Sequence, residues 1–144
     1  MRVDGLMTVG ELARRTGLSI KAIRRYEALG LIYSAGRSDG GYRLFDDSAL
    51  WCARVIEALR SLGLTIREID ELARAYLNRP DEPIGPRLAE LLDAAERRIE
   101  DRIAELAAVR GRIREYRARH AAALGGRSDA ELFGEDPRRR QPAA

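Results

Sequence analysis

Residues 8–32 have the sequence TVGELARRTGLSIKAIRRYEALGLI, and the fold that we expect follows from this segment. It contains two short amphipathic segments, residues 8–17 and 19–30, and each starts at a hydroxyl residue and ends at a glycine. Thr8 and Ser19 are typical helix N-caps, because a hydroxyl oxygen accepts a hydrogen bond from a backbone N–H of the first turn. Two short helices joined by a Gly-Leu-Ser turn predict a helix-turn-helix.

The second segment carries a cationic surface. We assign Ile20 and Ile23 to the core of the domain. The cationic residues then fall on the remaining surface of the helix, and they are Lys21, Arg24 and Arg25. The second helix of such a pair can lie in the major groove of DNA and contact base edges and phosphates. A solvated charged face is the alternative for any basic helix taken alone, but the helix-turn-helix spacing favours DNA binding.

A turn rich in Gly, Ser and Asp follows, with a short apolar piece on either side, in residues 31–45 (LIYSAGRSDGGYRLF). This pattern predicts a β-hairpin directly after the cationic helix, in the position of a wing. The glycines allow a tight turn with positive φ. We expect the hairpin to carry the side chains that contact the DNA backbone beside the groove, which are Arg37, Tyr42 and Arg43.

A second pair of helices is predicted after the hairpin. Residues 46–62 begin with acidic residues, and their apolar face is predicted from helical spacing as Trp51, Val55, Leu59 and Leu62. In the next helix Thr65 and Glu68 form a capping box, and the predicted apolar face is Ile66, Ile69, Leu72, Ala73 and Tyr76. Arg67, in the first turn, either contacts a phosphate or is an ordinary surface arginine.

The C-terminal half predicts a linker, a long helix and a tail. Residues 78–87 contain three of the five prolines and predict a linker or sharp bend. Residues 88–121 predict one helix with heptad spacing, which is typical of a coiled coil. Two chains are expected to pair through Leu92, Ile99, Ile103, Leu106, Val109, Ile113 and Tyr116, in an orientation that the repeat does not fix. Residues 122–144 predict a largely disordered tail.

The composition argues against several classes of protein. Cys52 is the only cysteine and His120 the only histidine, so an intramolecular disulfide and a cysteine-rich metal site within one chain are excluded, and no cofactor is expected. The sequence offers no paired nucleophile and base and no phosphate-binding glycine loop, which argues against an enzyme. His120 lies at the end of the heptad pattern and is interpreted as a packing residue.

The charge balance favours nucleic acid as the partner. The chain has 25 arginines and one lysine, its pI is about 9.4, and arginine is the better bidentate partner for phosphate and guanine. The same bias is also typical of a GC-rich genome. The N-terminus does not resemble a signal peptide, and no apolar run approaches the roughly 18 residues needed to span a bilayer. We therefore expect a soluble, cytoplasmic protein with no membrane partner.

The combination of these motifs resembles the MerR family of bacterial transcription regulators. The resemblance is carried by R-R-Y-E-x-x-G-L-I at residues 24–32 together with G-Y-R at residues 41–43, and it covers residues 7–76 closely. It implies a mainly α fold, with a winged helix-turn-helix DNA-binding domain in residues 1–77. A dimerisation helix would follow and would form an antiparallel coiled coil.

The resemblance also implies a function and a set of DNA-facing residues. Such a protein is a nucleoid-associated homodimer that binds a pseudo-palindromic promoter site in double-stranded DNA and bends and untwists it so that RNA polymerase can engage. The positions that match the family's DNA-facing residues are Thr8, Lys21, Arg24, Arg25, Tyr26, Tyr42 and Arg43. Ser19, Arg37 and Arg67 complete the candidate DNA-binding set, and core packing remains the alternative for Tyr26.

The family's sensing chemistry does not carry over to this sequence. Its metal sensors resemble one another in having cysteines near the end of the dimer helix, and no cysteine follows Cys52 here. We interpret Cys52 as a packing residue rather than an electrophile sensor. A small apolar ligand, a protein partner or no effector at all remain open. An architectural or recombination-associated DNA-bending protein is the alternative function, whereas a coiled-coil adaptor would leave the wing and the cationic helix unexplained.

Overall fold

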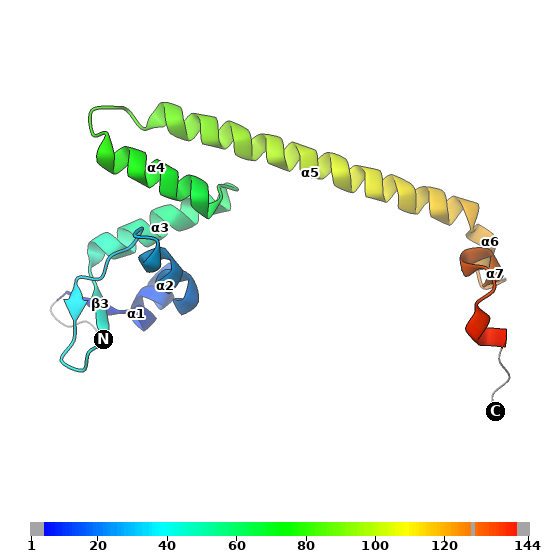
Figure 1. Cartoon of the computed structure of the whole chain (residues 1–144), viewed down its shortest axis with the longest axis horizontal. Helices are drawn as coiled ribbons and strands as arrows, with labels where there is room; N and C mark the ends of the chain where they lie inside the picture. The colour runs from blue at the N-terminus through cyan, green and yellow to red at the C-terminus, as the bar shows by residue number, and fades with distance from the viewer. Residues whose placement is uncertain (1–4, 128, 141–144) are drawn as a thin grey trace. The chain divides into compact units, whose positions relative to one another are not determined.

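The chain forms a series of helices with a small sheet near its N-terminus (Figure 1). The structure is a computed structural model and describes residues 5–127 and 129–140. The predictions for residues 1–4 of the N-terminal domain and for residues 128 and 141–144 of the tail lie outside the described residues. The elements are β1 (Met7–Thr8), α1 (Val9–Thr16), α2 (Ile20–Ala28), β2 (Gly36–Arg37), β3 (Arg43–Phe45), α3 (Asp47–Ser61), α4 (Ile66–Asn78), α5 (Gly85–Arg119), α6 (Ala121–Leu124), α7 (Ala130–Phe133) and η1 (Pro137–Arg140). The chain divides into an N-terminal unit, residues 1–97, and a C-terminal unit, residues 98–144.

The first two helices begin at the predicted caps. The hydroxyl of Thr8 accepts a hydrogen bond from the N–H of Glu11 at 3.3 Å, and that of Ser19 accepts one from the N–H of Ala22 at 3.0 Å. Gly17 ends α1 with a φ of +76°, a left-handed conformation that glycine adopts without steric cost. The helix-turn-helix is therefore present as predicted, although α2 ends at Ala28, two residues before Gly30.

The predicted hairpin is present and belongs to a three-stranded antiparallel sheet in the order β1-β3-β2. Strand β1 was not predicted, because two residues are too few for an alternating pattern to show. Its residues Met7 and Thr8 pair with Phe45 and Leu44 of β3. The central strand β3 is thus paired on both sides, and its two apolar residues are buried.

The core of the N-terminal unit forms among α1, α2, α3, α4, the sheet and the first turns of α5. Its largest fully buried side chains are Phe45, Met7, Leu12, Ile23 and Ile32. Leu91 and Ala95 of α5 are buried in the same core. Ile20, which the sequence assigned to the core, is exposed instead because it lies at the first position of α2.

The buried face of α3 differs in part from the predicted one. Of the four predicted residues, Leu59 packs against the core and Val55 is half-buried. Trp51 is 61% exposed and Leu62 is also exposed, whereas the buried residues of α3 are Ala49, Leu50, Ala53 and Ile56. These positions also recur at helical spacing, but two of them are alanines, whose small side chains allow close packing without standing out in the sequence. On α4, Ile69 and Leu72 are buried as predicted, and Tyr76 is exposed.

The linker is shorter and the tail more regular than predicted. Helix α4 continues to Asn78 and α5 begins at Gly85, so the connection comprises residues 79–84. Pro86 lies in the first turn of α5, where a helix tolerates proline because the N–H of that turn has no partner within the helix. The tail contains α6, α7 and η1, and the alanine run of α6 has a high helix propensity.

Candidate nucleic-acid interface

The cationic face of α2 is formed as the spacing predicts. Lys21, Arg24 and Arg25 are exposed, while Ile23 on the same helix is fully buried. Within the part of the chain that the structure describes, none of these three cations forms an ion pair, so their charges are available to a polyanion. Tyr26 is only 4% exposed and packs in the core, which supports the packing interpretation of this residue.

Thr8 and Ser19 lie at the N-termini of α1 and α2 as caps. Each hydroxyl oxygen accepts a backbone N–H of the first helical turn, as described above. Their observed role is therefore to fix where the two helices begin, and Ser19 does so on the helix that carries the cationic face.

The wing ends in a tight turn built by short hydrogen bonds. The N–H of Ser38 donates to the carbonyl of Tyr42 at 2.7 Å, and the N–H of Gly41 donates to the carbonyl of Ser38 at 2.8 Å. Gly41 has a φ of +81°, which explains the glycine at this position. Arg37 donates to the carbonyl of Gly41 at 3.2 Å. The Tyr42 side chain is 72% exposed at this turn, where a phosphate could reach it.

Arg43 forms an ion pair with Glu27 that the sequence analysis did not predict. Nη1 of Arg43, at the start of β3, donates to Oε1 of Glu27, near the end of α2. The Glu27 side chain is 13% exposed and that of Arg43 is 52% exposed. The two residues are separated by 16 positions, so no periodic pattern links them. The only available signal was that the R-R-Y-E and G-Y-R motifs occur in the same sequence.

Arg67 lies in the first turn of α4, next to a complete capping box. Thr65 accepts the N–H of Glu68 at 3.1 Å and its own N–H donates to the Glu68 carboxylate at 2.9 Å, as predicted. The Arg67 side chain is largely exposed and lies 3.7 Å from the carboxylate of Glu71. Exposed pairs of this kind contribute little, so the guanidinium remains available to a phosphate. Both interpretations of Arg67 therefore stay open.

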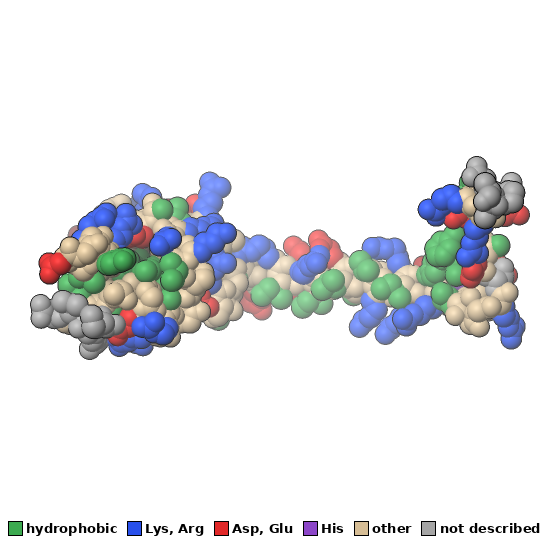
Figure 2. Space-filling view, turned by 90° about the horizontal axis from the view of Figure 1, so that it is seen from below, with side chains coloured by type: hydrophobic (Ala, Val, Ile, Leu, Met, Phe, Trp, Pro, Cys, Tyr) green, Lys and Arg blue, Asp and Glu red, His purple; other side chains and the backbone are tan. Residues whose placement is uncertain are grey.

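Helix α5 presents a row of apolar side chains to solvent. This row, the apolar seam, consists of Ile99, Ile103, Leu106, Val109, Ile113 and Tyr116, whose exposed fractions range from 39% to 61%. Figure 2 shows hydrophobic side chains along one side of this helix. Leu92, which the sequence placed in the same row, is half-buried against the core of the N-terminal unit.

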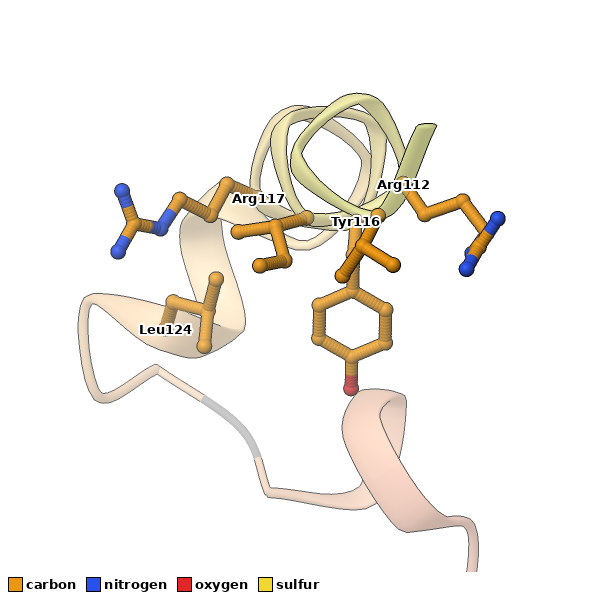
Figure 3. Close-up of a pocket in the computed structure, with 6 residues that line it drawn as sticks. Arg112, Tyr116, Arg117 and Leu124 are labelled. Carbon is orange, nitrogen blue, oxygen red and sulfur yellow. The ribbon is translucent and has the colours of Figure 1, made fainter. Parts of the chain in front are cut away.

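The end of the seam widens into an open hollow of about 390 Å³ (Figure 3). Tyr116 and Leu124 form part of its apolar wall, together with Val109 and Ile113. Arg112 and Arg117 lie on opposite sides of it. The rings of Tyr116 and His120 are 4.4 Å apart, and this contact agrees with the packing role predicted for the histidine.

Cys52 is half-buried on α3. Burial raises the pKa of its thiol above the usual value, and the nearby Asp46 carboxylate raises it further. A thiol with a raised pKa is protonated at neutral pH and is a poor nucleophile and metal ligand. Among the described residues, no three His, Cys, Asp or Glu side chains are grouped to hold a metal ion. Over the same residues, no helix has both the length and the apolarity needed to cross a membrane.

An exposed cationic helix at the second position of a helix-turn-helix, followed by a hairpin, defines a DNA-binding protein of the winged helix-turn-helix class. Residues 7–76 match the model of the MerR HTH family regulatory proteins, and residues 53–116 match the MerR DNA-binding region. The chain belongs to the MerR family.

Individual relatives agree with this assignment. The chain is similar to the transcriptional regulator CueR of Yersinia pestis, with 33% identity over 107 residues that cover 74% of this chain and 76% of CueR. It is 35% identical over 106 residues to the nodulation protein NolA of Bradyrhizobium sp. strain NC92, covering 74% of this chain but only 41% of NolA. The chain thus spans less than half the length of that relative.

A solved structure with the same architecture is that of the transcription regulator PbrR691 from Ralstonia metallidurans CH34 in complex with lead(II). The TM-score is 0.65 at 28% sequence identity, covering 78% of this chain and 85% of that protein. The predicted fold class, a helical protein with a winged helix-turn-helix and a long helix, is therefore confirmed.

Proposed function

We propose that this protein is a homodimeric transcription regulator, not an enzyme, that binds a pseudo-palindromic promoter site in the bacterial cytoplasm and acts by bending and untwisting the DNA. RNA polymerase would then engage the deformed promoter. The observation that carries the proposal is the exposed cationic face of α2, which forms no ion pair among the described residues and lies in the same unit as the wing. The names of relatives such as CueR, a transcriptional regulator, support the regulatory role.

The α2 face and the wing supply two kinds of contact with DNA. Lys21, Arg24 and Arg25 would lie in the major groove, where arginine recognises guanine and any cation can contact phosphate. Tyr42 and Arg43 of the wing would contact the sugar-phosphate backbone beside the groove. Binding should therefore weaken steeply as salt rises, because each neutralised phosphate releases a counterion.

The apolar seam supports a dimer. Six large apolar side chains on one face of a solvated helix are a typical interaction surface, and a second copy offers an identical seam. The hollow at the seam's end continues the same surface and would be covered by the partner helix.

The charge distribution along α5 supports an antiparallel arrangement. From residue 85 to 105 the helix has six carboxylates and four arginines, whereas from residue 106 to 119 it has five arginines and one glutamate. Antiparallel pairing brings the acidic half of each chain beside the basic half of the other. Parallel pairing would place like charges together, and flanking charges of this kind select the orientation of coiled coils.

A selection experiment tests the proposed function. Full-length protein would be used to enrich duplexes from a pool of random sequence, and the bound fragments would be sequenced. We expect an inverted repeat, bound by two chains and bent in a gel assay that varies the position of the site. Tight binding without any enriched sequence would contradict the proposal and would favour an architectural DNA-bending protein.

A further inference from the structure

We propose that Glu27 is a positioning residue of the DNA interface, which holds the guanidinium of Arg43 so that it can bind a phosphate while it is still paired with Glu27. The inference rests on the DNA-binding function proposed above. It concerns a carboxylate that simple charge considerations would exclude from a surface that approaches DNA.

The ion pair with Glu27 anchors the part of the wing that strand β1 does not reach. Strand β1 pairs with β3 only at Leu44 and Phe45. Arg43 is the next residue toward the tip, and its strand partner is Arg37 of the short strand β2. A two-stranded hairpin of this length is marginally stable by itself. The ion pair with Glu27 joins this part of the wing to α2, the helix that carries the cationic face.

The exposures of the pair indicate which member faces the DNA. Glu27 is the covered partner, with 13% of its side chain exposed, while half of the Arg43 side chain is open to solvent. A guanidinium has five N–H donors in a planar fork. Glu27 engages Nη1, so the other donors can serve a phosphate oxygen. In this arrangement the carboxylate fixes the direction of the fork and the arginine shields the carboxylate from the DNA.

Two explanations of Glu27 predict opposite changes in DNA affinity when the residue is removed. If Glu27 only adds negative charge near the interface, removing it strengthens DNA binding, because repulsion of the phosphates is relieved. If Glu27 positions Arg43, removing it weakens binding even though the protein becomes more positive. Whether DNA affinity rises or falls in the Glu27 variants therefore distinguishes the two explanations.

The test measures the affinity of the full-length chain for the selected duplex and for a shuffled duplex by fluorescence anisotropy. The variants are Glu27→Gln, Glu27→Ala, Arg43→Ala and the Glu27→Ala/Arg43→Ala double variant. Glu57→Gln, at an exposed position of α3, is the matched control because it changes the net charge by the same amount as Glu27→Gln. Thermal unfolding of each variant checks that it is folded.

We expect Glu27→Ala to bind the selected duplex about fivefold more weakly, with a smaller loss for Glu27→Gln, whose amide oxygen can still accept a hydrogen bond. Glu57→Gln should bind no more weakly than the unmodified protein. The double variant should bind no more weakly than Arg43→Ala alone, because Glu27 acts through Arg43. Glu27→Gln keeps the side-chain shape and carries the test if Glu27→Ala does not fold.

If the Glu27 variants bind DNA as tightly as the unmodified protein or more tightly, this inference is overturned while the proposed function stands. The same holds if the losses of affinity in Glu27→Ala and Arg43→Ala add fully in the double variant. If the unmodified protein binds no duplex better than a shuffled one, the proposed function fails and this inference fails with it.

Discussion

The core of the N-terminal unit and the seam of α5 use the same kinds of side chain in opposite ways. Phe45, Leu12 and Ile23 are almost completely buried within their own unit. Ile103 and Leu106 on α5 are more than half exposed. Burial of apolar surface is the main favourable term in folding, so the first region is complete in one chain. The second is left exposed in the single chain, and it is the surface that the proposed dimer would bury.

The largest effect on stability is expected in the core. Phe45→Ala removes a side chain that is 1% exposed, and we expect it to lower the free energy of unfolding by about 3–5 kcal/mol. Trp51→Ala removes a larger ring that is mostly exposed, and it should cost less than about 1 kcal/mol. Urea denaturation followed by circular dichroism measures both. A larger loss of unfolding free energy for Trp51→Ala than for Phe45→Ala would mean that Trp51 is buried, which would contradict the observed face of α3.

The next largest effect is expected on dimerisation. Leu106→Glu places a carboxylate in the middle of the seam of both chains, and we expect dimerisation to weaken by about 3 kcal/mol, roughly a hundredfold. Ala118→Glu is the matched control, because it adds the same charge at an exposed position of α5 outside the seam. Sedimentation velocity over a range of concentrations gives the dimer dissociation constant. Equal dissociation constants for the two variants would mean that the seam is not part of the dimer interface.

A smaller effect tests the orientation of the two helices. Arg112→Glu together with Arg117→Glu reverses two charges beside the hollow, and we expect dimerisation to weaken about tenfold. Adding Glu96→Arg and Glu100→Arg should restore part of the affinity if the chains are antiparallel, because the acidic half then lies opposite the basic half. In a parallel pair these positions do not meet, so the added changes would give no recovery in the same sedimentation assay.

The smallest effect is expected at Cys52. Its raised pKa leaves less thiolate at pH 7–8 than an ordinary cysteine has, so alkylation by iodoacetamide should be slower in the folded protein than in urea. The rate should rise as the pH increases toward the raised pKa. Cys52→Ser should leave DNA affinity within about twofold, since the residue lies outside the candidate interface. Rapid alkylation of the folded protein at neutral pH would support the sensor interpretation instead.

Local signals in the sequence predicted much of the fold. The caps Thr8, Ser19 and Thr65 lie where hydroxyl residues precede amphipathic segments, and each accepts the expected N–H. The hairpin followed from its glycines, and the exposed cations of α2 followed from helical spacing. These features depend on neighbours within a few residues, so the sequence contains what is needed to find them.

Features that depend on distant residues could not be predicted in the same way. The buried face of α3 is set by what packs against it, and Trp51 favoured the wrong face because large aromatic residues are usually buried. Leu92 fits the heptad repeat yet packs on the N-terminal unit. The pairing of Glu27 with Arg43 joins two elements whose approach is determined by the fold, and it gave no signal in either motif alone.

In the proposed function, the apolar seam brings two DNA-binding units together on one symmetric site. The most direct test measures the affinity of the unmodified protein and of Leu106→Glu for the selected full site and for an isolated half-site. We predict that the unmodified protein prefers the full site by about a hundredfold, as expected when two linked units bind at once, and that Leu106→Glu loses this preference while binding the half-site as well as before. An unchanged preference in Leu106→Glu, or no preference in the unmodified protein, would contradict the proposed dimer on a symmetric site.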